Sequence, residues 1–175
     1  MVSLIIFQKM NEESDFIKKL YALKVRDLME PVNQDMTLVE KNADISSVLP
    51  VLDKKDHVWV VDSKETSHII GVITEYDTIS LFSPLYTPLQ YFDKPSLQSF
   101  QYGLNVTAEE VMSKNPISAS PDEKIMDVIL KIKQHKVKQL PVVDKENKLL
   151  GEIKLHHLIE RYTKEQAATQ KTKIL

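Results

Sequence analysis

Two polar side chains three residues apart, Thr74 and Asp77, belong to the stretch GVITEYD at residues 71–77. After a predicted strand, this spacing is typical of a helix capping box. In such a box the Thr74 hydroxyl accepts from the Asp77 amide, and the Asp77 carboxylate accepts from the Thr74 amide. The same residues suit a ribose or a phosphate, because a carboxylate accepts from ribose hydroxyls and a helix N-terminus presents amides. The residues alone leave both interpretations open, a structural cap and a ligand site.

The stretch GEIKLHH at residues 151–157 repeats the first one at a spacing of 80, with the glycine kept. Lys154 stands in the place of the threonine and His157 in the place of the aspartate. Lysine has no acceptor and a neutral histidine accepts through one ring nitrogen, so the carboxylate that would hold a ribose diol is missing. If these positions hold a ligand, we expect one competent site and one altered site. Lys154 is predicted to be a surface lysine or, alternatively, to face a phosphate.

Similar spacings relate other parts of the chain in the same order. Apolar residues at 45, 48 and 49 match those at 125, 128 and 129, VVD appears at 60–62 and 142–144, and LME at 28–30 parallels VMS at 111–113. Ordered matches of this kind indicate two copies of one supersecondary unit.

Each copy is predicted to run helix, strand, strand, helix. In the first copy, periodicity indicates a helix near 43–53, strands at 57–62 and 69–73, and a helix at 75–82. In the second copy, the segment Ser120-Pro121-Asp122-Glu123 is a capping signal for the first helix. Strands at 140–143 and 149–153 and an amphipathic helix from residue 155 follow. Pro50 removes an amide donor from the helix near 43–53, so we expect a kink or an early end there.

The composition is that of a globular protein without a strong charge bias. The chain has 175 residues, of which 42% are hydrophobic and 27% charged, and its formal net charge is −2. This charge gives no general attraction to nucleic acid or to an anionic membrane, and no apolar run reaches spanning length. We therefore expect neither partner, and we interpret the tail 161–175 as a solvated helix. The absence of cysteine excludes disulfides and thiolate metal sites and fits a cytoplasmic location.

No residue pattern indicates an enzyme. The three glycines, at 71, 103 and 151, exclude a Walker loop and a G-x-G-x-x-G motif. No local motif joins a nucleophile to a histidine base, and the five histidines lack the i, i+4 spacing that a helical metal site favours. The chain is therefore predicted to have no catalytic residues and no metal site.

The ordered motifs resemble a tandem pair of CBS domains, the regulatory module named for cystathionine β-synthase. VRDLMEP, VWVVD and GVITEYD, followed by AEEVMSKNPISASP, LPVVD and GEIKLHH, carry the likeness over residues 25–160. The resemblance implies an α+β fold of two β-α-β-β-α repeats in a pseudo-twofold arrangement, with small mixed sheets packed with helices. The expected segments are an N-terminal helical extension (1–24), repeat 1 (25–83), an aromatic and proline-rich linker (84–105), repeat 2 (106–160) and a C-terminal helical tail (161–175). The linker is interpreted either as a packed connection or as an exposed patch that docks a partner.

In that family each cleft is built across the pair, and the clefts commonly bind adenosine derivatives. The resemblance therefore implies that Asp77 holds the ribose diol and that Thr74 holds the ribose or a phosphate. Their crossed partners would be Asn115, Pro116, Ile117, Val137 and Lys138. Within this set, the two apolar side chains Ile117 and Val137 would flank an adenine, and Lys138 would neutralise phosphates.

The second cleft is expected to bind nucleosides more weakly, because it lacks the carboxylate. By the same resemblance it would combine Lys154 and His157 with residues from the first repeat, Val32 and His57. Glu30 and Pro31 would lie on the same crossed segment as Val32. If Lys154 faces a phosphate, a ligand in this cleft would be held mainly through its phosphates.

The resemblance implies a stand-alone regulatory module that binds an adenosine-type nucleotide (AMP, ADP, ATP or S-adenosylmethionine) and signals to a separate, unidentified effector protein. The nucleotide would be a regulatory ligand, and no obligatory cofactor is expected. Amphipathic helix surfaces near 45–52 and 125–132 predict a homodimer. The alternative is a ligand-independent module for dimerisation or protein interaction, with empty clefts.

Overall fold

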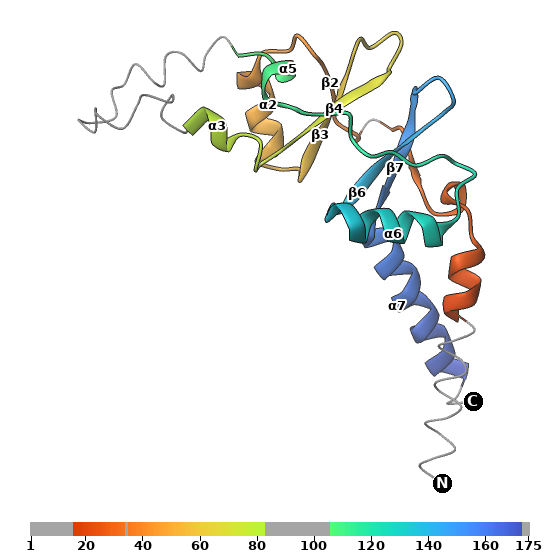
Figure 1. Cartoon of the computed structure of the whole chain (residues 1–175). Helices are drawn as coiled ribbons and strands as arrows, with labels where there is room; N and C mark the ends of the chain where they lie inside the picture. Colours follow the sequence, from red (N-terminus) through yellow and green to blue (C-terminus); the bar gives the residue numbers. More distant parts are fainter. Residues whose placement is uncertain (1–15, 34, 83–105, 173–175) are drawn as a thin grey trace. The chain divides into compact units, whose positions relative to one another are not determined.

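The chain folds into two compact units (Figure 1). The computed structural model describes residues 16–33, 35–82 and 106–172. The repeat-1 unit contains the described residues between 33 and 116 together with residues 146–148, and the repeat-2 unit contains the others. Each unit therefore includes the segment that opens the other repeat. The predicted linker 84–105 and residues 1–15 of the predicted N-terminal extension lie outside the described residues.

The repeat-1 unit is a four-stranded sheet with helices packed against it. The strands, in hydrogen-bonded order, are β2 (Leu38–Glu40), β3 (His57–Val61), β4 (Ile69–Thr74) and β5 (Ser113–Lys114). β2 is parallel to β3, and the other neighbours are antiparallel. The helices are α2 (Ile45–Leu52), α3 (Ile79–Phe82) and α5 (Ala108–Val111). The buried core comprises Ile45, Val48, Leu52, Val58, Val60, Ile73, Ala108, Val111 and Met112.

The repeat-2 unit is a three-stranded antiparallel sheet with two long helices beside it (Figure 1). Its strands are β1 (Glu30–Pro31), β7 (Leu149–Lys154) and β6 (Gln139–Val143), with β7 in the middle. The helices are α6 (Ile125–His135), α7 (Leu155–Thr172) and the short 3-10 helix η1 (Val25–Asp27). Residues 16–22 are also helical. The buried core comprises Phe16, Leu20, Val25, Ala119, Ile125, Val128, Ile132, Leu140, Val142, Ile153 and Leu158. The predicted α+β class is confirmed.

The two glycines that the repeat keeps lie where a short strand crosses closely. Gly151 is the register partner of Pro31, and a Cβ atom at residue 151 would clash with the backbone of Glu30 and Pro31. Gly71 is the register partner of Lys114, and a Cβ atom there would clash with the Met112 side chain. At residue 151 only glycine leaves room for this approach, and at residue 71 any other residue requires the Met112 side chain to move. The two glycines are therefore explained by strand pairing: the segment that opens each repeat pairs with the last strand of the other repeat.

The second repeat's first helix begins at Ile125, so the prediction that the cap at Ser120 starts it was wrong. The expected capping pair closes a turn instead. The Ser120 amide donates to the Glu123 carboxylate at 3.2 Å, and the Glu123 amide donates to the Ser120 carbonyl at 3.1 Å. Lys124 is then extended, because the Ile125 amide donates to the Leu23 carbonyl at 2.9 Å. Pairing with residues 23 and 24, just before the first repeat, sets this helix start.

The first repeat's helices are also shorter than predicted. The helix expected over 75–82 is a turn over 75–78 followed by α3. The amides of residues 77–79 donate to carbonyls three residues back, which gives successive turns rather than α-helical hydrogen bonds. α2 contains Pro50 and continues two residues beyond it to Leu52, so the helix does not end at the proline; it has 8 residues, whereas α6 has 11.

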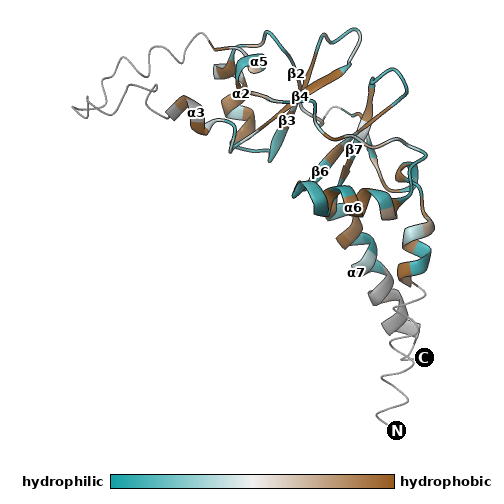
Figure 2. Ribbon diagram, in the orientation of Figure 1, coloured by the Kyte–Doolittle hydropathy of each residue, from teal (hydrophilic) through white to brown (hydrophobic). Residues whose placement is uncertain are grey.

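Large apolar side chains are exposed on both long helices of the repeat-2 unit, and Figure 2 shows hydrophobic positions on α6 and at the start of α7. The outward positions of α2, by contrast, are Ser46, Ser47 and Pro50. Among the helices within the described ranges, none combines the length and the apolar character that a membrane crossing requires. The exposed apolar side chains are Met126 and Leu130 on α6 and Leu155, Ile159 and Tyr162 on α7.

Candidate functional site

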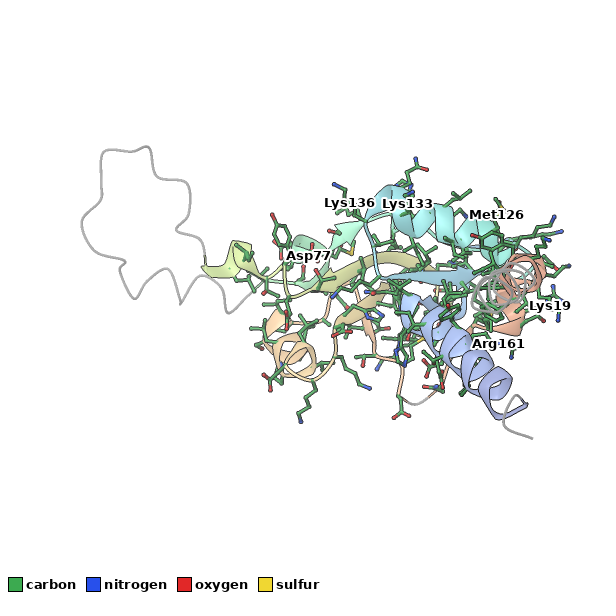
Figure 3. All side chains as sticks on the ribbon, turned by 90° about the horizontal axis from the view of Figure 1, so that it is seen from below. Lys19, Asp77, Met126, Lys133, Lys136 and Arg161 are labelled. Atoms are coloured by element: carbon green, nitrogen blue, oxygen red, sulfur yellow. The ribbon has the colours of Figure 1, made fainter. Side chains whose placement is uncertain are left out.

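The first junction, residues 74–77 between β4 and α3, brings Thr74 and Asp77 into direct contact (Asp77 is labelled in Figure 3). Oδ2 of Asp77 accepts from the Thr74 amide at 2.8 Å and from the Thr74 hydroxyl at 2.6 Å. The Asp77 amide donates to the Thr74 carbonyl at 3.1 Å rather than to the hydroxyl. The carboxylate half of the predicted capping box is therefore confirmed, and the hydroxyl half was wrong.

The other oxygen of Asp77 contacts the crossing strand β5. The Ser113 hydroxyl donates to Oδ1 at 2.6 Å, and β5 reaches this position because it pairs with β4 beside Gly71. Asp77 is half-buried and Ser113 is exposed. The prediction from sequence missed Ser113. The usable signal was the match of VMS with LME, which makes Ser113 and Glu30 equivalent positions of the two repeats.

Asn115 and Pro116 follow β5 in the same unit as the first junction. The Asn115 amide donates to the Ile70 carbonyl at 3.0 Å, and Asn115 has a left-handed φ of 52°, which asparagine tolerates better than most residues. The side chains of Lys114 and Asn115 are exposed, and Pro116 is half-buried. The unit therefore sets polar, solvent-facing residues on the strand that contacts the Asp77 carboxylate.

Three further residues predicted for the first cleft, Ile117, Val137 and Lys138, belong to the repeat-2 unit. The Ile117 side chain is 37% exposed, and Val137 packs half-buried against the core of its unit. Lys138 is exposed, and its carbonyl accepts from the Leu155 amide at 2.8 Å. Their roles beside an adenine and a phosphate stay predictions.

At the second junction, residues 154–157 between β7 and α7, a histidine ring takes the place of the carboxylate. The Lys154 amide donates to Nδ1 of His157 at 3.3 Å, as the Thr74 amide donates to Asp77. A ring nitrogen that accepts carries no proton, so this contact requires the neutral tautomer with its proton on Nε2. Nε2 lies 3.7 Å from Oε2 of Glu30. The two junctions therefore share a backbone arrangement, but the first has a carboxylate where the second has a neutral imidazole.

Two carboxylates hold the ammonium group of Lys154. Its Nζ lies 2.6 Å from Oε1 of Glu152 and 3.4 Å from Oε2 of Glu30. Glu152 is only 3% exposed, and a buried carboxylate depends on such a partner. Lys154 is half-buried and paired, so it lies at the surface of its unit with its ammonium group held by two carboxylates. The prediction also missed Glu152, whose signal is a single glutamate in the apolar strand LLGEIK.

This network moves two pKa values in opposite directions. Burial alone lowers the pKa of Lys154, but hydrogen bonds and charges from Glu152 and Glu30 outweigh burial and leave that pKa raised. Burial and the nearby Lys154 charge lower the pKa of His157, against the opposing effect of Glu30 and Glu152. Both shifts favour a charged lysine beside a neutral histidine. In the described part of the chain, no three or more histidine, aspartate or glutamate side chains form a group that could hold a metal ion.

The remaining residues predicted for the second cleft, Val32 and His57, lie in different units. Val32 follows β1, its side chain is 44% exposed, and its amide donates to the Leu150 carbonyl at 3.0 Å. His57 begins β3, where the sheet register pairs it with Thr74 of the first junction, and its ring centroid lies 4.8 Å from that of Trp59. A shared ligand for Val32 and His57 stays a prediction.

Known proteins with this architecture identify the family. The model of the CBS domain matches residues 25–83 and 108–164, so the chain belongs to the CBS domain family and carries two copies of that domain. A curated relative, a homoserine O-acetyltransferase of Methanosphaera stadtmanae, is 28% identical over 153 residues, which cover 86% of this chain and 26% of that protein. The chain thus spans about a quarter of the length of this relative.

Three solved structures show the same fold. A CBS-pair protein from Arabidopsis thaliana in complex with AMP has a TM-score of 0.61 at 24% identity, covering 85% of this chain and 98% of that one. A CBS domain pair in complex with 5-methylthioadenosine and S-adenosyl-L-methionine has a TM-score of 0.61 at 21% identity, covering 82% and 98%. The CBS domain of a bacterial CNNM/CorC family Mg²⁺ transporter in complex with ATP has a TM-score of 0.64 at 19% identity, covering 87% and 96%.

Proposed function

We propose that this chain is a regulatory module that binds an adenosine-type nucleotide at the first junction and signals to a separate partner protein. The observation that carries the proposal is the Asp77 carboxylate, which Thr74 fixes on one oxygen and the exposed Ser113 contacts on the other. A carboxylate held in this way is oriented to accept hydrogen bonds from two adjacent ribose hydroxyls. The nucleotide is a regulatory ligand rather than a substrate.

The first junction can exchange its own hydroxyls for those of a ribose. The Thr74 amide keeps Oδ2 of Asp77 in place, whereas the hydroxyls of Thr74 and Ser113 are neutral donors. Ser113 is exposed, so water can satisfy its hydroxyl once a ribose hydroxyl has replaced it. The exchange substitutes one neutral donor for another and leaves no charge without a partner.

The rest of the ligand is assigned by the family resemblance. Ile117 and Val137 are proposed to contact the adenine and Lys138 the phosphates, with Asn115 and Pro116 beside the ribose. The structural neighbours support an adenosine ligand, since AMP, S-adenosylmethionine and ATP share an adenosine group and differ in what they attach to it. The adenosine group, with its ribose diol, is therefore the recognised part, and the attached group sets the preference among nucleotides.

Calorimetric titration with AMP, ADP, ATP and S-adenosylmethionine tests the proposal. Each positive compound is then compared with its 2′-deoxy analogue, which lacks one of the two hydroxyls that Asp77 accepts from. We expect the analogue to bind at least about tenfold more weakly, because a hydrogen bond to a charged group contributes about 1.5–3 kcal/mol. Folded protein that binds none of the compounds, or that binds the deoxy analogue equally well, contradicts the proposal.

A second candidate, homodimerisation without a ligand, is supported by the exposed apolar side chains of the repeat-2 unit. Met126 and Leu130 are one helical turn apart on α6, and Met126 is labelled on that helix in Figure 3. Side chains spaced in this way form a stripe that a second copy can cover. Sedimentation at micromolar concentration should give twice the chain mass of 20.1 kDa, and a species of the single-chain mass contradicts this candidate.

A further inference from the structure

The two crossing strands bring different residues to equivalent positions. Ser113 of β5 contacts Asp77 at the first junction, and Glu30 of β1 contacts both Lys154 and His157 at the second. Asn115 and Val32 continue the equivalence, because their amides donate to the carbonyls of Ile70 and Leu150, which are also 80 residues apart. The repeats therefore present the same backbone, and the difference between the junctions lies in the side chains.

At the second junction the polar side chains are bound to each other. The Lys154 ammonium contacts Glu152 at 2.6 Å and Glu30 at 3.4 Å, and the Lys154 amide donates to His157 Nδ1 at 3.3 Å. Glu152 has no polar counterpart in the first repeat, where Val72 stands at the matching position. Four charged or titratable groups thus replace the serine, valine, threonine and aspartate of the first repeat.

This network opposes both ways of holding a nucleotide. A ribose diol donates hydrogen bonds and needs an acceptor, but the single acceptor nitrogen of His157 already accepts from the backbone, and Oε2 of Glu30 already accepts from the Lys154 ammonium. A phosphate needs the Lys154 ammonium, but drawing that group away leaves the buried Glu152 carboxylate without its counter-charge. The phosphate would also approach the Glu30 carboxylate, and like charges repel.

We propose that the second junction is closed to nucleotides by this internal network of Glu30, Glu152, Lys154 and His157, and that the chain takes a single nucleotide, at the first junction. The inference rests on the function proposed above and adds a stoichiometry to it. The network takes the place of a ligand, because it pairs the Lys154 ammonium with two carboxylates of the same unit and ties β1 to β7.

Equilibrium dialysis with AMP and with ATP measures the stoichiometry directly. Wild-type protein should bind one nucleotide per chain, and Asp77→Ala should weaken that binding roughly 10- to 150-fold without revealing a second site. Two nucleotides per chain in the wild type overturns the inference and leaves the proposed function intact. A nucleotide retained at comparable affinity by Asp77→Ala overturns both, because the proposed function places the ligand on the Asp77 carboxylate. No nucleotide bound by folded wild type overturns both.

A gain-of-function variant tests the cause. Glu30→Ser, Glu152→Val, Lys154→Thr and His157→Asp together copy Ser113, Val72, Thr74 and Asp77 of the first repeat. In a variant that keeps the wild-type circular dichroism, the stoichiometry should rise from one to two, and combining the four changes with Asp77→Ala should give one. A folded variant that stays at one overturns the inference. If the variant does not fold, the wild-type and Asp77→Ala stoichiometries still decide the matter.

Discussion

The hydroxyl of Ser113 donates to Oδ1 of Asp77 at 2.6 Å, so a residue from the opening segment of the second repeat stabilises the junction of the first. Glu30 makes the matching contact in the other repeat, 3.4 Å from Nζ of Lys154. In the first pair a neutral donor meets a carboxylate, and in the second two opposite charges meet. The two junctions thus share a construction, but neutral donors contact a carboxylate at the first, and two carboxylates contact an ammonium group at the second.

Asp77→Ala is expected to weaken nucleotide binding by about 1.5–3 kcal/mol, which is the contribution of hydrogen bonds to a charged group. This corresponds to a Kd roughly 10- to 150-fold higher. Calorimetry with AMP or ATP measures the change. Because Asp77 also supports the turn through the Thr74 amide, the variant should lose about 1 kcal/mol of stability as well.

Glu110→Ala is the matched control for this loss of stability. Oε2 of Glu110 accepts from the Thr107 amide at 2.8 Å and from the Thr107 hydroxyl at 2.9 Å, the same pair of contacts that Asp77 makes with Thr74. Both variants should therefore lower the melting temperature by similar amounts. Only Asp77→Ala should weaken nucleotide binding. An equal effect of the two variants on Kd would mean that the loss of stability, not the loss of the Asp77 carboxylate, weakens binding.

Ser113→Ala is expected to strengthen nucleotide binding. The serine hydroxyl occupies the position on Asp77 that the proposed function assigns to a ribose hydroxyl, so on that proposal its removal removes a competitor. A typical hydrogen bond contributes about 0.5–1.5 kcal/mol, so the Kd should fall by roughly 2- to 10-fold. Titration of the variant with AMP measures this effect. A Kd that rises instead would show that Ser113 contacts the ligand itself.

The sequence repeat predicted most of the fold, because apolar periodicity and turn residues act locally. The strands at 57–62 and 69–73 and those at 140–143 and 149–153 are found within one residue of the predicted bounds. The start of α6 was wrong because a distant segment decides it, through the hydrogen bond from Ile125 to Leu23. Local pattern cannot report such a pairing.

The chemistry of the junctions was only partly readable from the sequence. The contact between Thr74 and Asp77 follows from their spacing of three residues, and the structure shows it. The roles of Ser113 and Glu152 depend on which strand crosses which, and that is a property of the fold. The pairing of Lys154 with Glu152 could not be predicted for a further reason. Residues two apart on a strand share a face, so the two side chains could meet, but glutamate is rarely buried and was therefore not expected on the inner face.

Gly151→Ala is expected to destabilise the protein more than Gly71→Ala does. The added methyl group at residue 151 meets the backbone of Glu30 and Pro31, which cannot move without displacing β1. At residue 71 it meets the Met112 side chain, which can change rotamer. Overpacking of this kind costs about 1–3 kcal/mol, and thermal melts of the two variants should place Gly151→Ala at the upper end. Equal melting temperatures would contradict the close crossing of β1.

The stability of the protein should depend on pH through His157. The pKa of this histidine is lowered from its usual 6.5 in the folded protein, by burial and by Lys154. Between the two pKa values the unfolded chain therefore binds more protons, so stability is complete above about pH 6.5 and falls as the pH decreases through the folded pKa. Protonation also removes the Nδ1 acceptor of the Lys154 amide.

Urea unfolding between pH 5 and pH 7.5 measures this dependence. The control is His157→Asn, whose amide oxygen can accept from Lys154 at every pH in this range. Subtracting its profile removes the contributions of the four other histidines and of the neighbouring carboxylates Glu30 and Glu152. A wild-type profile that matches the variant would mean that His157 does not titrate with folding.

The ion pair of Lys154 with Glu152 should behave as a unit in which removing one member is worse than removing both. Lys154→Met leaves the carboxylate of Glu152, 3% exposed, without its ammonium. Breaking a buried pair in this way costs about 3–5 kcal/mol, and we expect about 2–4 kcal/mol because the lysine is partly exposed. The double change Glu152→Val with Lys154→Thr copies Val72 and Thr74 of the first repeat. It should stay within about 1 kcal/mol of the wild type, because replacing both members of such a pair is often neutral.

Unfolding followed by two probes locates this effect in the correct unit. The single tryptophan, Trp59, is 1% exposed and reports on the repeat-1 unit, whereas circular dichroism is dominated by the long helices α6 and α7 of the repeat-2 unit. Lys154→Met should shift the dichroism transition to lower urea by more than it shifts the tryptophan transition. If the double variant is as unstable as Lys154→Met, Glu152 does not depend on Lys154, and the network at the second junction is not held together by this pair.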